Sequence, residues 1–369
     1  MRSTVYLIGA GPGAADLITL RGYRCLQKAD VVIFDHLVNP ELLDIAPQHA
    51  ERIDIGPVAP ESRDQDAICY LLAEKAREGK TVARLKWGDP FLFDRGGEEA
   101  LFLHEQGLQF EVIPGVPHAI GASAYAGVPI TYPGGGDTVT FVRGHEDEGR
   151  EKTRIDWEAL AKLEGTIVSY AGPQQLPKML KALIDHGRSP EEPAAIIMRG
   201  TLSSQQTITG TLGELVERLQ EQPAGTALLI VGKVVNFRDH LRWFDSRPLF
   251  GRQALVMHSK EQPDDLAELL RSQGAEVIID GDTHADIYRL LLDRKIDLVT
   301  FTSASAVLNF AANFGADQVS DLLTHTVVAV QGNAAADAAT RANITPVLQH
   351  PAGPVASFAE AIVSKFKGN

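Results

Sequence analysis

Short apolar runs alternate with segments whose apolar residues recur at helical spacing along most of this chain. In its first part, the pattern predicts strands at 4–11, 30–35, 51–56, 81–88 and 109–115, and helices at 16–29, 40–47, 66–79 and 97–107. Strands that are joined by helices need crossover connections, which favour parallel pairing. We therefore expect an α/β domain built on a parallel sheet.

The texture of the chain changes after residues 114–115, where a helix of small residues follows at 118–127. Further strands are predicted at 137–145, 165–172, 194–201 and 226–235, with helices at 173–187 and 211–220. A third alternating segment begins after a linker at 245–252 that contains proline and glycine. We expect three α/β domains, at 1–113, 114–245 and 247–369.

The composition is that of a globular protein, with 369 residues, of which 44% are apolar and 22% charged. A net charge of −13 disfavours nucleic acids and anionic membranes as partners. Only Cys25 and Cys69 are present, so no disulfide framework is implied. No apolar run reaches the length of a membrane span, and the first residues lack a signal-peptide pattern. We expect a cytoplasmic protein.

The first glycine turn, GAGPGA at 9–14, follows a predicted strand and precedes a helix. With Asp35 at the end of the next strand, it matches a dinucleotide-binding fingerprint. Pro12 stands where that loop must curve, and Asp16 would repel a pyrophosphate, so we do not favour a nicotinamide enzyme. Phosphate-loop, zinc and nucleophile-elbow motifs are absent from the sequence, and we expect no metal site.

A second glycine-containing turn, RLKWGDPFLFDRGGEEA at 84–100, follows the fourth predicted strand. Turns at the carboxyl end of a strand are where α/β proteins bind small ligands. Gly88 permits close approach of a ligand to the backbone, whereas the neighbouring Trp87 is the bulkiest side chain available. This turn is either a working ligand loop, a remodelled one, or one that has lost its ligand.

Several segments together resemble the motifs of the tetrapyrrole methylases, and among these the uroporphyrinogen-III C-methyltransferases. The resemblance rests on VYLIGAGPGAADLITLRG, ADVVIFDHLV, RLKWGDPFLFDRGGEE, VIPGVPHAIGASAYAGVPIT and TFVRGHE, which occur in the family's order. It implies two α/β domains with a cleft between them, usually in a homodimer. It also implies S-adenosylmethionine as cofactor and a tetrapyrrole as substrate, on the route to sirohaem and cobalamin.

The resemblance assigns roles to individual positions of this sequence. Asp35 resembles the family's general base. The cofactor-binding positions correspond to Pro12, Trp87, Gly88, Asp89, Leu92, Pro117, His118, Ala171 and Gly200. The chemistry agrees, since an electron-rich pyrrole carbon attacks a sulfonium methyl group and needs mainly positioning and a group that moves the displaced proton.

The chain departs from the family pattern at several loop positions. Pro57 replaces the family's proton-donating lysine, Trp87 and Asp94 replace glycines, and Pro133 replaces an arginine of an anion-binding pair. Arg84, Lys86, Arg95 and Arg143 remain possible partners for the carboxylates of a uroporphyrinogen. The departures leave open whether the protein methylates uroporphyrinogen III, methylates another tetrapyrrole, or binds a tetrapyrrole or a partner without catalysis.

The third predicted domain resembles uroporphyrinogen-III synthase over RPLFGRQALVMHSKEQPDDLAELLRSQGAEV and later segments. That family has two α/β domains with the active site between them, whereas 247–369 has room for one. The family's Thr-Arg after the first strand is also replaced by His258 and Ser259. We therefore expect a truncated, synthase-like domain with a structural or docking role rather than synthase activity.

Overall fold

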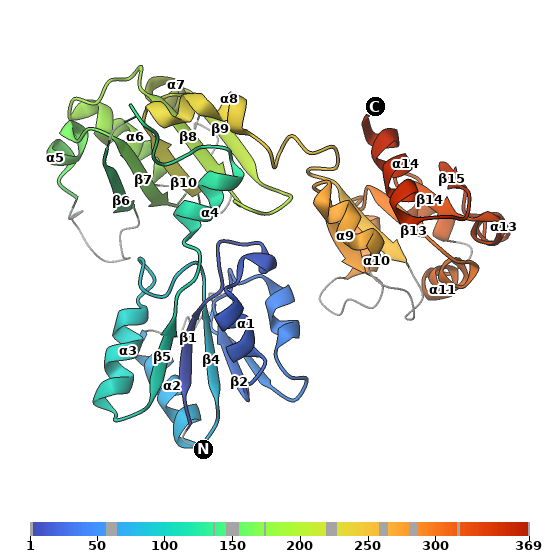
Figure 1. The fold of residues 1–369 in the computed structure, drawn as a ribbon, viewed down its shortest axis with the longest axis horizontal. Coiled ribbons are helices and arrows are strands. Elements are labelled where there is room, and N and C mark those ends of the chain that lie inside the picture. The colour runs from blue at the N-terminus through green and yellow to red at the C-terminus, as the bar shows by residue number, and fades with distance from the viewer. Residues whose placement is uncertain are drawn as a thin grey trace. The chain divides into compact units, whose positions relative to one another are not determined.

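The computed structural model describes residues 3–56, 65–135, 137–144, 155–172, 175–218, 227–257, 265–279, 286–315 and 318–367. The chain forms two compact units, Met1–Arg242 and Trp243–Asn369. Three separate five-stranded sheets organise them, two in the first unit and one in the second (Figure 1). Each sheet is covered by helices, as the alternating sequence pattern predicts.

The first sheet has the strand order β3-β2-β4-β1-β5, and all of its strands are parallel. The strands are β1 (Val5–Gly9), β2 (Val31–Phe34), β3 (Glu51–Asp54), β4 (Val82–Lys86) and β5 (Phe110–Ile113). The helices are α1 (Leu20–Leu26), α2 (Gln65–Arg77) and α3 (Gly96–Glu105), with short 3-10 helices at Ala15–Leu17 and Pro40–Ile45. Because β1 lies between β4 and β5, the loops that follow these three strands come together at one edge of the sheet.

The second sheet is mixed rather than parallel, in the order β6-β7-β10-β8-β9. Its strands are β6 (Val139–Arg143), β7 (Thr166–Ala171), β8 (Pro193–Met198), β9 (Gln206–Thr211) and β10 (Ala227–Val231). The helices are α4 (His118–Tyr125), α5 (Trp157–Lys162), α6 (Leu176–Asp185), α7 (Leu212–Arg218) and α8 (Arg238–Leu241), with a 3-10 helix at Lys233–Phe237. The apolar pattern does not predict β9, because this edge strand reads QTITGT and is only partly buried.

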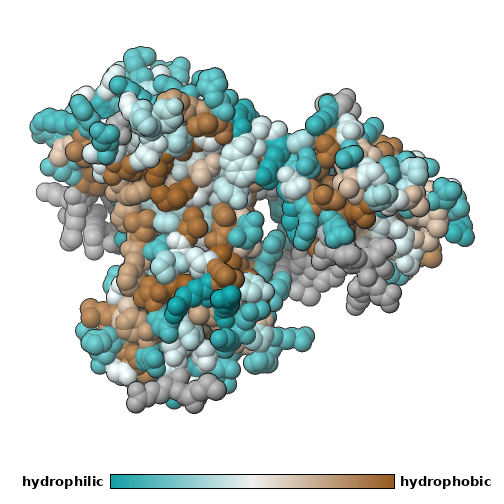
Figure 2. Space-filling model, in the orientation of Figure 1, coloured by the Kyte–Doolittle hydropathy of each residue, from teal (hydrophilic) through white to brown (hydrophobic). Residues whose placement is uncertain are grey.

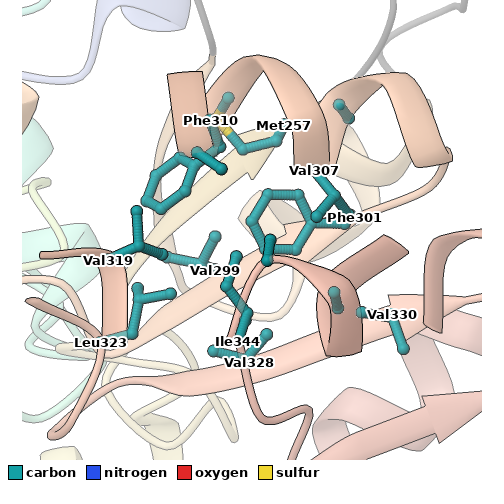
Figure 3. Close-up of a cluster of buried hydrophobic side chains, with 14 of the residues drawn as sticks. Met257, Val299, Phe301, Val307, Phe310, Val319, Leu323, Val328, Val330 and Ile344 are labelled. Atoms are coloured by element: carbon teal, nitrogen blue, oxygen red, sulfur yellow. The ribbon is translucent and has the colours of Figure 1, made fainter. Parts of the chain in front are cut away.

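The sheet of the second unit is parallel, in the order β12-β11-β13-β14-β15. Its strands are β11 (Gln253–Met257), β12 (Glu276–Ile279), β13 (Leu298–Phe301), β14 (Val327–Gln331) and β15 (Leu348–His350). The helices are α9 (Asp265–Ser272), α10 (Ile287–Leu292), α11 (Ala304–Phe314), α12 (Val319–Leu322), α13 (Asn333–Arg341) and α14 (Val355–Lys367). Phe301 of β13 packs edge-to-face on Phe310 of α11, with 5.4 Å between ring centroids, inside the apolar cluster of Figure 3.

Polar side chains cover much of the molecular face shown in Figure 2, and apolar residues reach the surface mainly in the middle part of the first unit. Among the described residues, no helix combines the length and the apolar character that crossing a membrane requires. His104, His186 and His240 lie exposed on the surface, away from any buried cluster.

Candidate functional site

Three glycines allow the loops after β1, β4 and β5 to touch backbone to backbone. A Cβ atom on Gly9 would lie 2.4 Å from the Gly115 nitrogen, and one on Gly115 would lie 2.2 Å from the Gly88 carbonyl oxygen. Gly88 has a φ of +75° and exchanges two backbone hydrogen bonds with Gly11, at 2.8 and 3.2 Å. A Cβ atom at Gly9 or Gly115 would collide with backbone atoms, and Gly88 adopts a positive φ, so glycines allow the three loops to meet at this edge of the first sheet.

Asp89 ties two of these loops together. Its Oδ2 accepts the Gly115 N–H at 3.0 Å, and its Oδ1 accepts the Phe91 N–H at 2.9 Å. Leu92 lies in the same turn and donates its N–H to the Asp89 carbonyl at 3.3 Å. The carboxylate thus fixes the loop geometry, while its remaining lone pairs stay available to a ligand.

The loop after β1 also joins the first sheet to the elements of the second. Pro12 packs against α4, where a Cβ atom on Gly121 would come within 2.5 Å of the Pro12 Cγ. The Ala14 N–H donates to the Thr201 Oγ1 at 2.9 Å, directly after Gly200. Gly200 in turn packs on Ala122 of α4, so the loops after β1 and β8 meet at one helix.

Aromatic rings from three segments, namely the turn after β4, the start of α4 and the end of β7, line this junction. The Trp87 and His118 rings lie 4.4 Å apart between centroids, and Phe93 meets Tyr170 edge-on at 5.3 Å. The Tyr170 hydroxyl accepts the Ala119 N–H at 3.1 Å, which anchors the start of α4. Pro117 is the N-cap residue of α4 and lies directly before the buried His118. Trp87 is partly buried and therefore keeps part of its indole accessible.

His118 is buried and has one ring nitrogen without a partner. Its Nδ1 lies 3.2 Å from the Pro12 carbonyl oxygen, so this nitrogen carries the proton and donates it. Burial lowers the pKa of His118 to about 4, and the imidazole is therefore neutral at pH 7. The Nε2 atom is then a buried acceptor with no hydrogen-bond partner in the described structure. Such an atom fits an N–H or O–H donor of a ligand.

Asp35 lies directly after β2, beside the turn that carries Trp87. Its Oδ1 accepts a hydrogen bond from Arg84 Nη2 at 2.6 Å, and its Oδ2 accepts the Trp87 N–H at 3.1 Å. The Asp35 side chain keeps 22% of its surface exposed, whereas Arg84 keeps 2%. A carboxylate that is oriented by two donors and still reaches solvent is suited to accept a proton.

Behind Asp35 lies a group of buried charges, which we call the charged cluster: Asp35, Arg84, Lys86, Asp94 and Glu99. The fully buried Glu99 accepts from Lys86 at 2.9 Å and from Arg84 at 3.3 Å through its Oε1. Asp94 forms an ion pair with Lys86 at 3.6 Å. Burial is the largest influence on Asp94 and raises its pKa to about 8, against the opposing effect of Lys86.

The structure brings together most of the residues that the sequence singles out. Contacts join Pro12, Trp87, Gly88, Asp89, His118 and Gly200, and Asp35 is connected to them through the Trp87 N–H. Ala171 is buried at the end of β7, next to Tyr170, where it pairs with Ala227 of β10. Pro133 lies exposed, and Pro57 falls outside the described residues.

Several basic residues contact carboxylates of the protein itself, and the site contains three residues that the sequence motifs do not mark. Arg84 and Lys86, considered as partners of substrate carboxylates, are buried against Glu99 instead. Arg95 pairs with Glu98 at 2.7 Å on the surface. Glu99, Tyr170 and Thr201 were not predicted, and the only signal for Glu99 was the presence of two basic residues on one buried strand face.

Comparison with known proteins adds family information to this geometry. Residues 4–216 match the family model described as Tetrapyrrole (Corrin/Porphyrin) Methylases, and residues 244–353 match that of Uroporphyrinogen-III synthase HemD. Siroheme synthase 1 of Yersinia pseudotuberculosis is 46% identical over 246 residues, covering 66% of this chain and 51% of that protein. The Uroporphyrinogen-III C-methyltransferase of Bacillus subtilis is 40% identical over 276 residues, covering 74% of this chain and 57% of that protein.

The chain thus spans about half the length of the curated relatives it matches. Among solved structures, a uroporphyrin-III C-methyl transferase from Thermus thermophilus, complexed with S-adenyl homocysteine, is 36% identical with a TM-score of 0.55. The alignment covers 63% of this chain and 99% of that protein. A cobalt precorrin-4 methyltransferase is 28% identical with the same TM-score.

Proposed function

Because this chain belongs to the tetrapyrrole (corrin/porphyrin) methylases, we propose that its first unit transfers methyl groups from S-adenosylmethionine to carbon atoms of uroporphyrinogen III, giving precorrin-2 for sirohaem or cobalamin synthesis. The observation that supports this most is the position of Asp35. Its partly exposed carboxylate is held by Arg84 and by the backbone of the same turn that carries Gly88 and Asp89. A proton acceptor that follows β2 and a ligand-binding turn that follows β4 are thereby linked by a hydrogen bond.

The residues around this turn fit a sulfonium cofactor. A cation is favoured next to aromatic faces, and Trp87, Phe93 and Tyr170 supply such faces. His118 is neutral at pH 7, so it does not repel a cation, and its unpartnered Nε2 can accept from a polar hydrogen of the cofactor. We propose that Pro12, Trp87, Gly88, Asp89, Leu92, Pro117, His118, Ala171 and Gly200 form this binding site.

In the reaction, the bound cofactor supplies an electrophilic methyl group. The protein's part is to hold the pyrrole carbon in line with that group and to exclude water. As the new carbon–carbon bond forms, the Asp35 carboxylate accepts the proton that the substrate loses. Arg84 and the Trp87 N–H orient Asp35 for this transfer, since each donates to a different carboxylate oxygen.

The proposal is tested with Asp35→Asn in the full chain, with Asp54→Asn as a matched control. Asp54 also ends a strand of the first sheet, but it faces His36 at 3.4 Å and the backbone of Gly56. We expect both variants to bind S-adenosylhomocysteine like the unmodified chain in calorimetry. Methyl transfer to uroporphyrinogen III is expected to fall by about 10²–10⁴-fold in Asp35→Asn alone.

Failure of the unmodified chain to bind S-adenosylhomocysteine at millimolar concentration would contradict the methyltransferase assignment. Binding without methyl transfer to uroporphyrinogen III would instead support a different tetrapyrrole substrate or a non-catalytic binding role. Equal activity of Asp35→Asn and Asp54→Asn would remove Asp35 from the mechanism.

We further propose that the protein works as a cytoplasmic homodimer, with domains at 1–113, 114–245 and 247–369. Its two cysteines, Cys25 and Cys69, form no disulfide, which is compatible with a reducing compartment. For the synthase-like part we propose a structural or docking role; the described residues of 247–369 form one parallel five-stranded sheet. Light scattering of the purified chain measures the oligomeric state directly.

A further inference from the structure

Asp94 is held in the charged cluster by a constrained stretch of backbone. The residues on either side of it, Phe93 and Arg95, have φ values of +60° and +53°, a region that non-glycine residues rarely adopt. Such strain persists where surrounding contacts over-determine it. Here the Phe93 ring packs edge-on against Tyr170, and Asp94 lies beside Lys86 at 3.6 Å.

Among the described residues, the cluster contains more carboxyl groups than cations. Within this part of the chain, Asp35, Asp94 and Glu99 face the cations Arg84 and Lys86, which are both 2% exposed. From α2, Gln65 also donates to Glu99 Oε1 at 3.4 Å, and the thiol of Cys69, whose pKa burial raises, faces the same carboxylate. Because uncompensated charge is costly in a buried site, one proton balances the cluster at neutral pH.

The hydrogen bonds indicate which carboxyl group carries that proton. Asp35 accepts from Arg84 and from the Trp87 N–H, and Glu99 Oε1 accepts from Arg84, Lys86 and Gln65. The buried Oδ2 of Asp94 and Oε2 of Glu99 both lack a hydrogen-bond partner in the described structure. The two groups differ in that Glu99 accepts three donors through its Oε1, whereas the described contact of the Asp94 carboxyl group is the 3.6 Å ion pair with Lys86. Its raised pKa of about 8, to which Asp35 also contributes, agrees with this assignment.

We propose that Asp94 is a positioning residue that stores the proton of the charged cluster and thereby controls how strongly Asp35 attracts the proton of the substrate. The proposal rests on the proposed function, in which Asp35 is the proton acceptor. It deepens that function by assigning a role to a group that does not itself touch the substrate.

The proton balance follows from the charges. When Asp35 takes the substrate's proton, Arg84 loses a negative partner, and Asp94 ionises and releases its own proton to water on its 27% exposed side. The cluster then resets when Asp35 gives up its proton to solvent and Asp94 regains one. Each methyl transfer therefore releases one proton overall, and no other reactant is needed.

The pH dependence of kcat in the full chain tests this coupling. When Asp94 ionises, it adds a third negative charge to the cluster, beside Asp35 and Glu99, and this charge favours transfer of the substrate's proton to Asp35. We therefore expect kcat to rise by about three- to tenfold between pH 7 and pH 9, with an inflection near pH 8. In Asp94→Asn the inflection is expected to vanish, whereas Glu98→Gln, which removes an exposed carboxylate four residues along, keeps it.

A second readout does not depend on methyl transfer. Infrared difference spectra between pH 6.5 and pH 9.5 are expected to show the loss of one protonated carboxylic acid in the unmodified chain and in Glu98→Gln, but not in Asp94→Asn. Absence of this signal in the unmodified chain overturns the proton-storing role. Its presence in a chain without methyl transfer overturns the proposed function and leaves the stored proton in place. An unchanged pH profile in Asp94→Asn overturns the coupling to Asp35.

Discussion

Replacing Asp94 by asparagine is expected to stabilise the protein, and increasingly so as the pH rises from 4 to 8. Asparagine has nearly the shape of a protonated aspartate but cannot ionise. The ordinary pKa of 3.8 is raised to about 8 in the folded chain, so between these values the folded state holds a proton that the unfolded state has lost. Stability contributed by this site therefore falls as the pH rises, and the loss stops above the folded pKa.

The size of the effect follows from the shift. Each pH unit between the unfolded and the folded pKa lowers the free energy of unfolding by about 1.4 kcal/mol. Over the whole range this gives an upper limit of about 6 kcal/mol. Since the Asp94 side chain keeps 27% of its surface exposed, solvent screening reduces that limit. We expect the free energy of unfolding of Asp94→Asn to exceed that of the unmodified chain by about 2–4 kcal/mol at pH 7 and to equal it near pH 4.

Urea unfolding at a series of pH values measures this difference. A Trp243→Phe background leaves Trp87 and Trp157, which both report on the unit Met1–Arg242. Glu98→Gln serves as control, because its exposed pair with Arg95 is worth at most about 1 kcal/mol. A stability difference for Asp94→Asn that stays constant from pH 5 to pH 8 would refute the reasoning, because the site would then be ionised in the folded state.

Three further substitutions examine the packing and the charges of the site. Gly115→Ala is expected to lower the free energy of unfolding by at least about 2 kcal/mol, because its Cβ atom would lie 2.2 Å from the Gly88 carbonyl oxygen. Gly97→Ala, on the open side of α3, is instead expected to raise the free energy of unfolding by about 0.5–1 kcal/mol. Urea unfolding measures both changes. Equal effects of the two would contradict the close backbone contact. Glu99→Gln removes the carboxylate between two buried cations and is expected to cost about 3–5 kcal/mol in the free energy of unfolding at pH 5, where Asp94 stays protonated. A loss below about 1 kcal/mol at that pH would contradict the buried pairing. His118→Ala is expected to weaken S-adenosylhomocysteine binding about tenfold in calorimetry. This difference in affinity is expected to stay the same between pH 6 and pH 9, because the pKa of His118 is about 4. A pH-dependent affinity in the unmodified chain would contradict a neutral imidazole.

The strands and helices were predictable where burial follows a simple period. β1, β8, β10 and β14 are short apolar runs, and each lies inside a sheet as expected. The order of the strands was not predictable in the second sheet, because β10 lies antiparallel between β7 and β8 and not beside β9, the strand that precedes it in the chain. Apolar periodicity also does not reveal β9, whose threonines form an edge that needs little burial.

The binding loops were identified through family motifs rather than through local propensity. Glycines at 9, 88 and 115 are far apart in sequence, and their mutual contact depends on the order of β4, β1 and β5 in the sheet. The same order explains how a hydrogen bond connects Asp89 to Gly115 across 26 residues. A sequence pattern can mark such glycines as turns, but it does not tell which turns touch.

The charged cluster shows why the chemistry of single residues was harder to predict than their location. Arg84 and Lys86 lie on the same face of β4, where a strand pattern indicates two basic groups directed to one side. Without the fold, a substrate carboxylate and a protein carboxylate were equally good partners for them. The packing of α3 places Glu99 between them, so their charge is already balanced within the protein. Asp94, which replaces a glycine of the family pattern, has a raised pKa, and the two cations beside it are already paired with Glu99 and Asp35.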